Sequence, residues 1–316
     1  MAYTPVLVYL ITGFLDSGKS SLIKSTLNDP DFMADGNKSL ILCMEHGEIE
    51  FEEDYLKDKK AEIEYFDSCA ELDTARMMEL DQQYQPNQVF IEWDGMTPVI
   101  DLLNQRMPQS WQLIQIITTI DASSFNLYIT NMRSIMYETA RFSDLIIFNR
   151  CSEDTKKSML RGNIKAINRA AQIIYEDVNG NVNQLADDDL PFDLNAAVID
   201  INDDDYGLWY MDAAENPPKY DGKKVRLRGR YAQQIPGYHQ SFILGRNAMV
   251  CCEQDTSLIG ITVTGVKIDQ MQLNDWVEVE GTIKTIDDDY GRMTCVLYAE
   301  SIRFYEKPED EYVYFS

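Results

Sequence analysis

Histidine is almost absent from this chain, which has only His46 and His239 among its 316 residues. A Ser-His-Asp or Cys-His catalytic arrangement needs a histidine beside its nucleophile. Neither histidine has sequence neighbours that suggest such an arrangement. We therefore expect no hydrolase chemistry of that kind.

Basic residues are also scarce, because 28 Lys and Arg stand against 53 Asp and Glu, a net charge of −25. Nonspecific binding to nucleic acid or to an anionic membrane surface needs a positive field, so the charge argues against both. The imbalance is uneven, since residues 1–219 have 17 basic and 38 acidic side chains, whereas residues 220–305 have 10 and 11. The segment 177–216 has eleven acidic residues and no Lys or Arg, which is typical of a solvated, self-repelling connector or of an exposed edge.

Long hydrophobic runs are missing as well. The apolar run Val6 to Ile11 is too short to cross a membrane or to form a secretory signal, and no basic residues precede it. We expect a buried strand there, and a cytoplasmic protein without direct membrane insertion. The six cysteines form no disulfide framework in a chain of this length, so we expect them to be thiols.

Up to about residue 200, short β-rich runs alternate with longer helical patterns. This predicts an α/β fold with a mainly parallel sheet covered by helices. The expected strands are Val6–Thr12, Ser39–Cys43, Val89–Trp93, Leu113–Asp121, Leu145–Asn149 and Gln172–Tyr175. The expected helices are Ser20–Leu27, Ala70–Gln83, Val99–Gln105, Phe125–Ala140 and Thr155–Asn168.

After Pro217-Pro218 the chain has only β-rich runs separated by turns, which predicts a small barrel of the OB type, with an SH3-like barrel as the alternative. The expected strands are Lys224–Tyr231, Ser241–Val250, Leu258–Val266, Trp276–Ile286 and Met293–Phe304. We therefore expect an α/β domain at 1–200, an acidic linker at 201–219, the barrel at 220–305 and an acidic tail at 306–316.

The strongest motif runs from Gly13 to Ser20 and fits the phosphate-binding pattern G-x-x-x-x-G-K-[ST]. It lies between an expected strand and an expected helix, where glycines let successive backbone N–H groups surround phosphate oxygens. Lys19 would neutralise charge at the β- and γ-phosphates, and the Ser20 hydroxyl would ligate Mg²⁺. The expected nucleotide-binding residues here are Gly13, Asp16, Ser17, Gly18, Lys19, Ser20 and Ser21.

An acidic residue at the end of the apolar run 89–93 fits the same chemistry. Glu92 could hold Mg²⁺ or its water shell, and Gly95, three residues later, could place its N–H near the γ-phosphate. We expect Lys19, Glu92 and Gly95 to be the catalytic residues. The alternative is a surface acid followed by a turn glycine.

Together these residues resemble the CobW/HypB/UreG family of P-loop GTPases, in particular its CobW-like branch. The segment Glu45 to Ile49 is similar to the family's N-E-F-G-E segment, and Ile120-Asp121-Ala122 is similar to its V-D-A strand end. The resemblance covers about residues 6–175. It implies a slow GTPase that binds GTP or GDP with Mg²⁺, and whose nucleotide state controls delivery of a metal ion, often zinc or cobalt, to a target.

The expected base-recognition segment departs from the family pattern. Where the family has N-K-x-D, the chain has Asn149-Arg150-Cys151-Ser152, so a hydroxyl replaces the carboxylate that would accept from guanine. The loss should cost about 1.5–3 kcal/mol of guanine preference, although Glu153 could substitute. Asn149 and Arg150 remain the expected base-binding residues, and ATP stays an alternative to GTP.

The expected metal motif also departs from the family pattern. Where CobW-like proteins have G-C-x-C-C, the chain keeps only Cys69, with Glu71 two positions later and Glu45 as a further candidate ligand. A tetrahedral zinc site prefers three or four Cys or His ligands, so this would be a poorer one. A small buried thiol is the alternative.

The barrel region resembles the YcgQ-type domain, which is associated with permease-like membrane proteins. The resemblance rests on the segments Phe242 to Arg246, Cys251 to Asp255, Gly260 to Val263 and Trp276 to Gly281. Cys251 and Cys252, with His239, are candidate transition-metal ligands. Buried or rim thiols are the alternative, because adjacent residues on a regular strand point to opposite faces.

Two hypotheses follow. The first is a CobW-like, Mg²⁺-dependent slow GTPase that acts as a metallochaperone or in metal homeostasis, and whose barrel engages a metal or a metal-receiving or permease-like partner. The second is a nucleotide-sensing adaptor with little hydrolysis and relaxed base specificity.

Overall fold

The computed structural model describes residues 5–30, 32–33, 37–45, 47, 50–182, 190–235, 240–249, 256–266, 270–287 and 291–315. The chain forms two compact units. The first unit comprises Met1–Thr155 and Asn168–Gln184, and the second comprises Lys156–Ile167 and Leu185–Ser316. Helix α7 (Lys157–Ile167), which connects two strands of the first unit, therefore belongs to the second.

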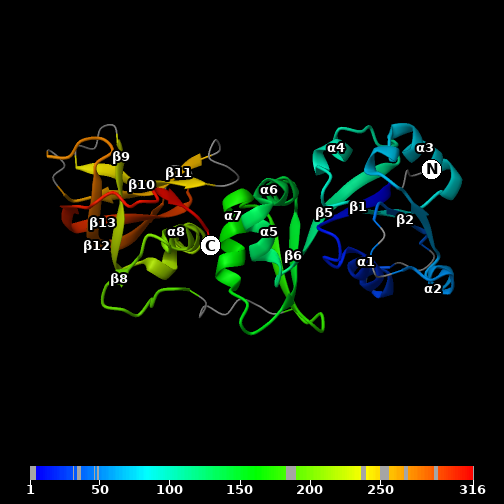
Figure 1. Ribbon diagram of the computed structural model, residues 1–316, viewed down its shortest axis with the longest axis horizontal. Helices are drawn as coiled ribbons and strands as arrows, with labels where there is room; N and C mark the ends of the chain where they lie inside the picture. Colours follow the sequence, from blue (N-terminus) through cyan, green and yellow to red (C-terminus); the bar gives the residue numbers. More distant parts are fainter. Residues whose placement is uncertain are drawn as a thin grey trace. The chain divides into compact units, whose positions relative to one another are not determined.

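A seven-stranded sheet with the order β3-β2-β4-β1-β5-β6-β7 forms the centre of the first unit (Figure 1). All of its strand pairs are parallel. Every residue of β2 and of β4 is buried, as expected for strands covered on both faces. The predicted parallel α/β fold is confirmed. The strands are β1 (Val6–Thr12), β2 (Ser39–Cys43), β3 (Ala61–Tyr65), β4 (Gln88–Glu92), β5 (Trp111–Asp121), β6 (Leu145–Cys151) and β7 (Gln172–Asp177).

Helices cover both faces of this sheet. Ile23 and Leu56 belong to one apolar cluster with β2 and β4, whereas Leu80 and Leu102 belong to a second cluster with β1 and β4. One predicted helix is divided in two, because the backbone of Met132 is not helical. The helices are α1 (Lys19–Asn28), α2 (Glu53–Asp58), α3 (Thr74–Tyr84), α4 (Val99–Leu103), α5 (Phe125–Asn131) and α6 (Arg133–Arg141).

Two elements of this unit, α2 and the edge strand β3, are missing from the sequence-based prediction. β3 has Glu62 and Glu64 at alternate positions and is only partly buried, as suits a strand with a neighbour on one side only. α2 is short and charged, and Leu56 is its one buried residue. Neither has the apolar pattern by which buried elements are recognised.

The second unit contains a closed five-stranded barrel with the order β9-β10-β11-β13-β12, in which β9 pairs with both β10 and β12 (Figure 1). The β11–β13 pair is parallel, and the other barrel pairs are antiparallel. This Greek-key barrel is of the predicted OB type. The strands are β9 (Lys224–Gln234), β10 (Ser241–Met249), β11 (Thr256–Thr264), β12 (Trp276–Asp287) and β13 (Met293–Phe304).

The expectation of a solvated acidic linker is wrong for residues 199–215. Strand β8 (Ile199–Asp200) pairs with β9, and helix α8 (Tyr206–Glu215) packs Tyr206 and Trp209 into the barrel core. The acidic residues suggested a linker, but Asp203, Asp204 and Asp205 precede an apolar helix and do not interrupt it. The acidic residues 187–189 lie outside the described part of the chain.

The last residues of the chain also pack into the second unit. Strand β14 (Tyr312–Val313) pairs with β10, and Phe315 is buried. The Asn163 side chain of α7 donates a hydrogen bond to the Phe315 carbonyl, and Arg161 pairs with Glu215 of α8 at 2.6 Å. Residues 310–315, which we call the C-terminal strap, thus hold α7 and α8 on the barrel.

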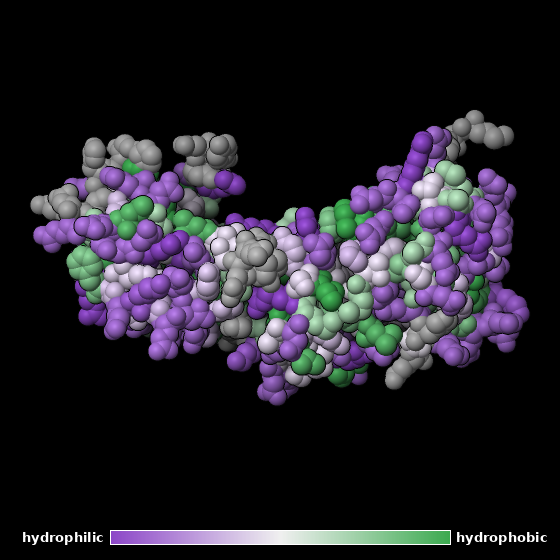
Figure 2. All heavy atoms as spheres, turned by 45° about the horizontal axis from the view of Figure 1, so that its top comes forward, coloured by the Kyte–Doolittle hydropathy of each residue, from purple (hydrophilic) through white to green (hydrophobic). Residues whose placement is uncertain are grey.

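Hydrophilic residues cover most of the molecular face shown in Figure 2, as the charged composition requires. Among the described residues, none of the helices has the length and apolar character needed to span a bilayer.

Replacing Gly207 by Ala should release the strap from α8. A Cβ at Gly207 would lie 2.4 Å from the Tyr314 carbonyl oxygen, so the clash should outweigh the gain in helix propensity and lower the free energy of unfolding by about 1–2 kcal/mol. Chemical denaturation measures this. Ala214→Gly, on the exposed side of the same helix, should cost only the propensity difference of about 1 kcal/mol. A more stable Gly207→Ala variant would contradict the packing.

Candidate functional site

The loop between β1 and α1 has the conformation of a phosphate-binding loop. Gly13 and Gly18 have φ angles of +139° and +101°, which residues with a side chain rarely adopt. Asp16 also has a positive φ, of 57°. Ser17 is fixed at the centre of the loop, because its hydroxyl lies 2.8 Å from the Thr119 hydroxyl of β5. The two motif glycines are therefore needed for the turn itself.

The Lys19 ammonium lies inside this loop, and the residue as a whole is 3% exposed. It donates to the carbonyl oxygens of Gly13 at 2.8 Å and of Phe14 at 3.0 Å. Its third bond is an ion pair with Glu45, which comes from the segment after β2. The loop therefore holds a fully paired, buried positive charge at the position expected for phosphate binding.

Glu92 at the end of β4 meets Ser20 at the start of α1, and the Ser20 hydroxyl donates to Glu92 Oε1 at 2.8 Å. The second carboxylate oxygen, Oε2, is buried and has no hydrogen-bond partner among the described residues. Burial raises the pKa of Glu92. A buried carboxylate oxygen without a strong donor, next to a hydroxyl, fits the oxygen ligands that Mg²⁺ prefers.

Two further carboxylates lie near Lys19. Burial raises the pKa of Glu45 to about 7, with Asp94 adding to the shift and Lys19 opposing it. Burial acts to raise the pKa of Asp94 as well, but hydrogen bonds from the Met96 N–H and the Thr97 hydroxyl outweigh it, so the pKa of Asp94 is lowered. The site therefore concentrates negative charge around one cation, and the sequence-based prediction did not include Asp94.

Gly95 lies directly against the loop. A Cβ at this position would be 2.2 Å from the Gly13 carbonyl oxygen and 2.8 Å from the Phe14 nitrogen. The segment after β4 can therefore approach the phosphate-binding loop only because residue 95 has no side chain. The structure thus places all three expected catalytic residues at this loop.

The expected base-binding residues of β6 also contact the loop. Asn149 donates to the Ser17 carbonyl at 2.6 Å. Arg150, with a positive φ of 53°, donates to the Asp16 carbonyl at 3.0 Å and pairs with Asp121 at 2.7 Å. These bonds join the ends of β5 and β6 to the loop. The role of Asp121 as the partner of Arg150 could not be inferred from the motif alone.

The position of the missing base-recognition carboxylate is held by Ser152, which is exposed. Its N–H donates to the Thr155 hydroxyl at 2.8 Å. Glu153, the suggested substitute, is also exposed. The hollow at the loop has a volume of about 60 Å³ and is lined by Leu15, Asp16, Gly18, Lys19, Ser20, Ser21, Glu45, Gly47, Glu92 and Arg150.

Glu45 and Cys69 are the candidate transition-metal ligands that the structure describes, and they form no metal cluster with other described residues. Cys69 is buried, which raises the pKa of its thiol, whereas Glu71 is exposed. In the part of the chain that the structure describes, no three His, Cys, Asp or Glu side chains are placed to hold a metal ion. His239, Cys251 and Cys252 lie outside the described residues, so their role as metal ligands stays a prediction.

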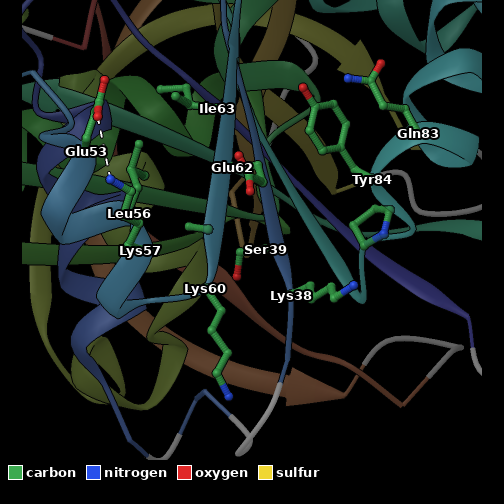
Figure 3. Close-up of a pocket in the computed structure, with 12 residues that line it drawn as sticks. Lys38, Ser39, Glu53, Leu56, Lys57, Lys60, Glu62, Ile63, Gln83 and Tyr84 are labelled. Carbon is green, nitrogen blue, oxygen red and sulfur yellow. Dashed lines mark ion pairs between the residues drawn. The ribbon is translucent and has the colours of Figure 1, made fainter.

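A larger hollow of about 950 Å³ lies elsewhere in the first unit (Figure 3). Its lining includes Lys38 and Ser39 at the start of β2, Ala61 at the start of β3, and Pro86 just before β4. In an open parallel sheet, ligands bind at the carboxyl ends of the strands. The smaller hollow at the loop is at that end, so it is the functional candidate.

Comparison with protein families agrees with this geometry. Residues 7–175 match the nucleotide-binding domain of CobW/HypB/UreG. The chain belongs to this family. Residues 179–315 of this CobW/HypB/UreG protein, which include the barrel, match the DUF1980 C-terminal domain. No curated protein matches the chain.

Three solved structures are similar to this family member. HypB, a hydrogenase maturation factor from Archaeoglobus fulgidus, is 18% identical, with a TM-score of 0.40 over 57% of this chain and 85% of its own. The zinc-bound YjiA GTPase from E. coli is 16% identical, with a TM-score of 0.42 over 93% and 89%. A zinc-bound triple mutant of YjiA is 15% identical, with a TM-score of 0.43 over 97% and 91%.

Replacing Gly95 by Ala should damage the loop. The added methyl group would overlap the Gly13 backbone, so we expect a loss of about 1–3 kcal/mol of unfolding free energy and weaker nucleotide binding. Denaturation and nucleotide titration measure the two effects. Gly47→Ala, whose Cβ would lie 3.4 Å from the Asp16 carboxylate, is the stability control. Equal stability of both variants and the wild type would refute the close approach.

Proposed function

We propose that this CobW/HypB/UreG protein is a cytoplasmic, Mg²⁺-dependent nucleotide-binding protein and a slow GTPase that acts in metal delivery or metal homeostasis. The arrangement of Lys19, Ser20 and Glu92 at the loop supports the proposal most directly. Lys19 offers a buried positive charge for a phosphate, and the loop offers backbone N–H groups. No other cluster in the described residues combines these properties.

Mg²⁺ would be held by Ser20 and Glu92, and when bound it would neutralise charge on the β- and γ-phosphates. The buried Glu92 Oε2 supports this assignment, because burial without a strong donor or cation is costly for a carboxylate. Gly95 positions the segment after β4 against the loop. Asn149 and Arg150 hold the β6 end, where a base would bind.

Replacing Lys19 by Ala tests the proposal. The variant loses the only positive side chain inside the loop, so binding of Mg-GTP and Mg-ATP should fall below detection by isothermal titration calorimetry. Lys24→Ala is the matched control, since Lys24 lies on the same helix but donates to the Glu50 carbonyl outside the loop. Unchanged titrations in Lys19→Ala would refute nucleotide binding at this site.

A nucleotide-sensing adaptor with little hydrolysis is the second candidate. The exposed Ser152 favours it, because a hydroxyl in place of a carboxylate discriminates guanine only weakly. The loss of the family's metal cysteines, of which the chain keeps only Cys69, also favours it.

Single-turnover release of phosphate separates the two functions. For the slow GTPase we expect measurable release from bound GTP, with a rate that responds to Zn²⁺ or Co²⁺ if metal delivery is coupled to hydrolysis. The control is the Lys19→Ala variant mixed with the same nucleotide. If the wild type binds nucleotide tightly but releases phosphate no faster than the control, the protein is the nucleotide-sensing adaptor.

A further inference from the structure

A carboxylate of the chain itself lies against the phosphate-binding lysine. The side chains of Lys19 and Glu45 are 2% and 13% exposed, so their ion pair is almost entirely buried. The backbone around Glu45 is fixed, because the Met44 N–H donates to the Glu92 carbonyl at 3.0 Å and the Cys43 thiol donates to the Glu45 carbonyl at 3.0 Å. The pair is therefore part of the folded site and not a surface contact.

The three bonds of Lys19 use all the donors that an ammonium group has. Two of its acceptors, the Gly13 and Phe14 carbonyls, belong to the loop that must stay in place to bind phosphate. The third acceptor, Glu45, is a side chain from another segment. An incoming phosphate oxygen can thus gain a bond from Lys19 most easily by replacing the Glu45 carboxylate.

We propose that Glu45 is an internal competitor for the phosphate site, which pairs with Lys19 in the nucleotide-free protein and is displaced when a nucleotide phosphate binds. The inference rests on the proposed function, because it concerns regulation of the same site. It also makes nucleotide binding move the Glu45 side chain, since its carboxylate has to leave Lys19.

The size of the hollow supports this competition. Its volume of about 60 Å³ is small beside the roughly 300–1,000 Å³ of typical ligand sites, and Glu45 forms part of its wall. Electrostatics act in the same direction. Once a phosphate takes Lys19, the Glu45 carboxylate would lose its ammonium partner and face that phosphate and Asp94, and like charges at short range repel.

Replacing Glu45 by Gln tests the proposal in the full-length protein. Gln keeps the shape but loses the charge-assisted bond, so Lys19 is more often available. Because the apparent affinity scales with the fraction of protein that is competent to bind, we expect the Kd for Mg-GTP and Mg-ATP to fall by roughly tenfold. Glu52→Gln is the control, since it removes one negative charge from an exposed position after the same strand, and its Kd should match the wild type.

The possible outcomes are distinct. An unchanged or higher Kd in Glu45→Gln, with wild-type binding intact, would overturn the competition; a higher Kd with slower hydrolysis would show that Glu45 supports the bound state instead. Failure of the wild type and of both variants to bind any nucleotide would overturn the proposed function itself. If circular dichroism shows that Glu45→Gln is unfolded, Glu45→Ala is measured in its place, with the same expected fall in Kd.

Discussion

A buried ammonium group has to be surrounded by acceptors, and this requirement organises the carboxyl end of the parallel sheet. Lys19 is the first residue of α1 and is almost fully enclosed. Loop carbonyls satisfy two of its donors, and a carboxylate from the neighbouring segment satisfies the third. Because β2, β4 and β1 are adjacent and parallel, their ends deliver Glu45, Glu92 and the loop to one place.

The two units use charge in different ways. In the first, acidic side chains gather around a single lysine, so a polyanion can bind only with help from backbone N–H groups and a cation. In the second, the charges cancel locally: the buried carboxylate of Glu278 pairs with Arg228 at 3.0 Å and with Arg303 at 2.7 Å. The near-zero net charge of the barrel therefore results from paired ions rather than from few ions.

Features that are encoded in a few consecutive residues could be predicted well from the sequence. The P-loop, the Glu92 position and the apolar strands could be recognised because each is contained in a few consecutive residues. Contacts such as Lys19–Glu45, Asn149–Ser17 and Arg150–Asp121 could not, because their partners are 26, 132 and 29 residues apart and meet only through strand order and register. Helix α8 was missed for another reason, since neighbouring acidic residues concealed its apolar face.

The placement of α7 has a consequence for synthesis on the ribosome. The chain leaves the first unit after Thr155, forms α7 in the second, and returns to the first at Asn168. The partners of α7 emerge later: α8 begins about 40 residues after α7 ends, and the strap that ends at Phe315 follows about 150 residues after α7. At about 5–20 residues per second, the strap becomes available on the order of ten to thirty seconds after α7 has been made. Until then, α7 lacks the contact between Asn163 and Phe315, so the packing of this helix is completed only when the last residues of the chain have been made.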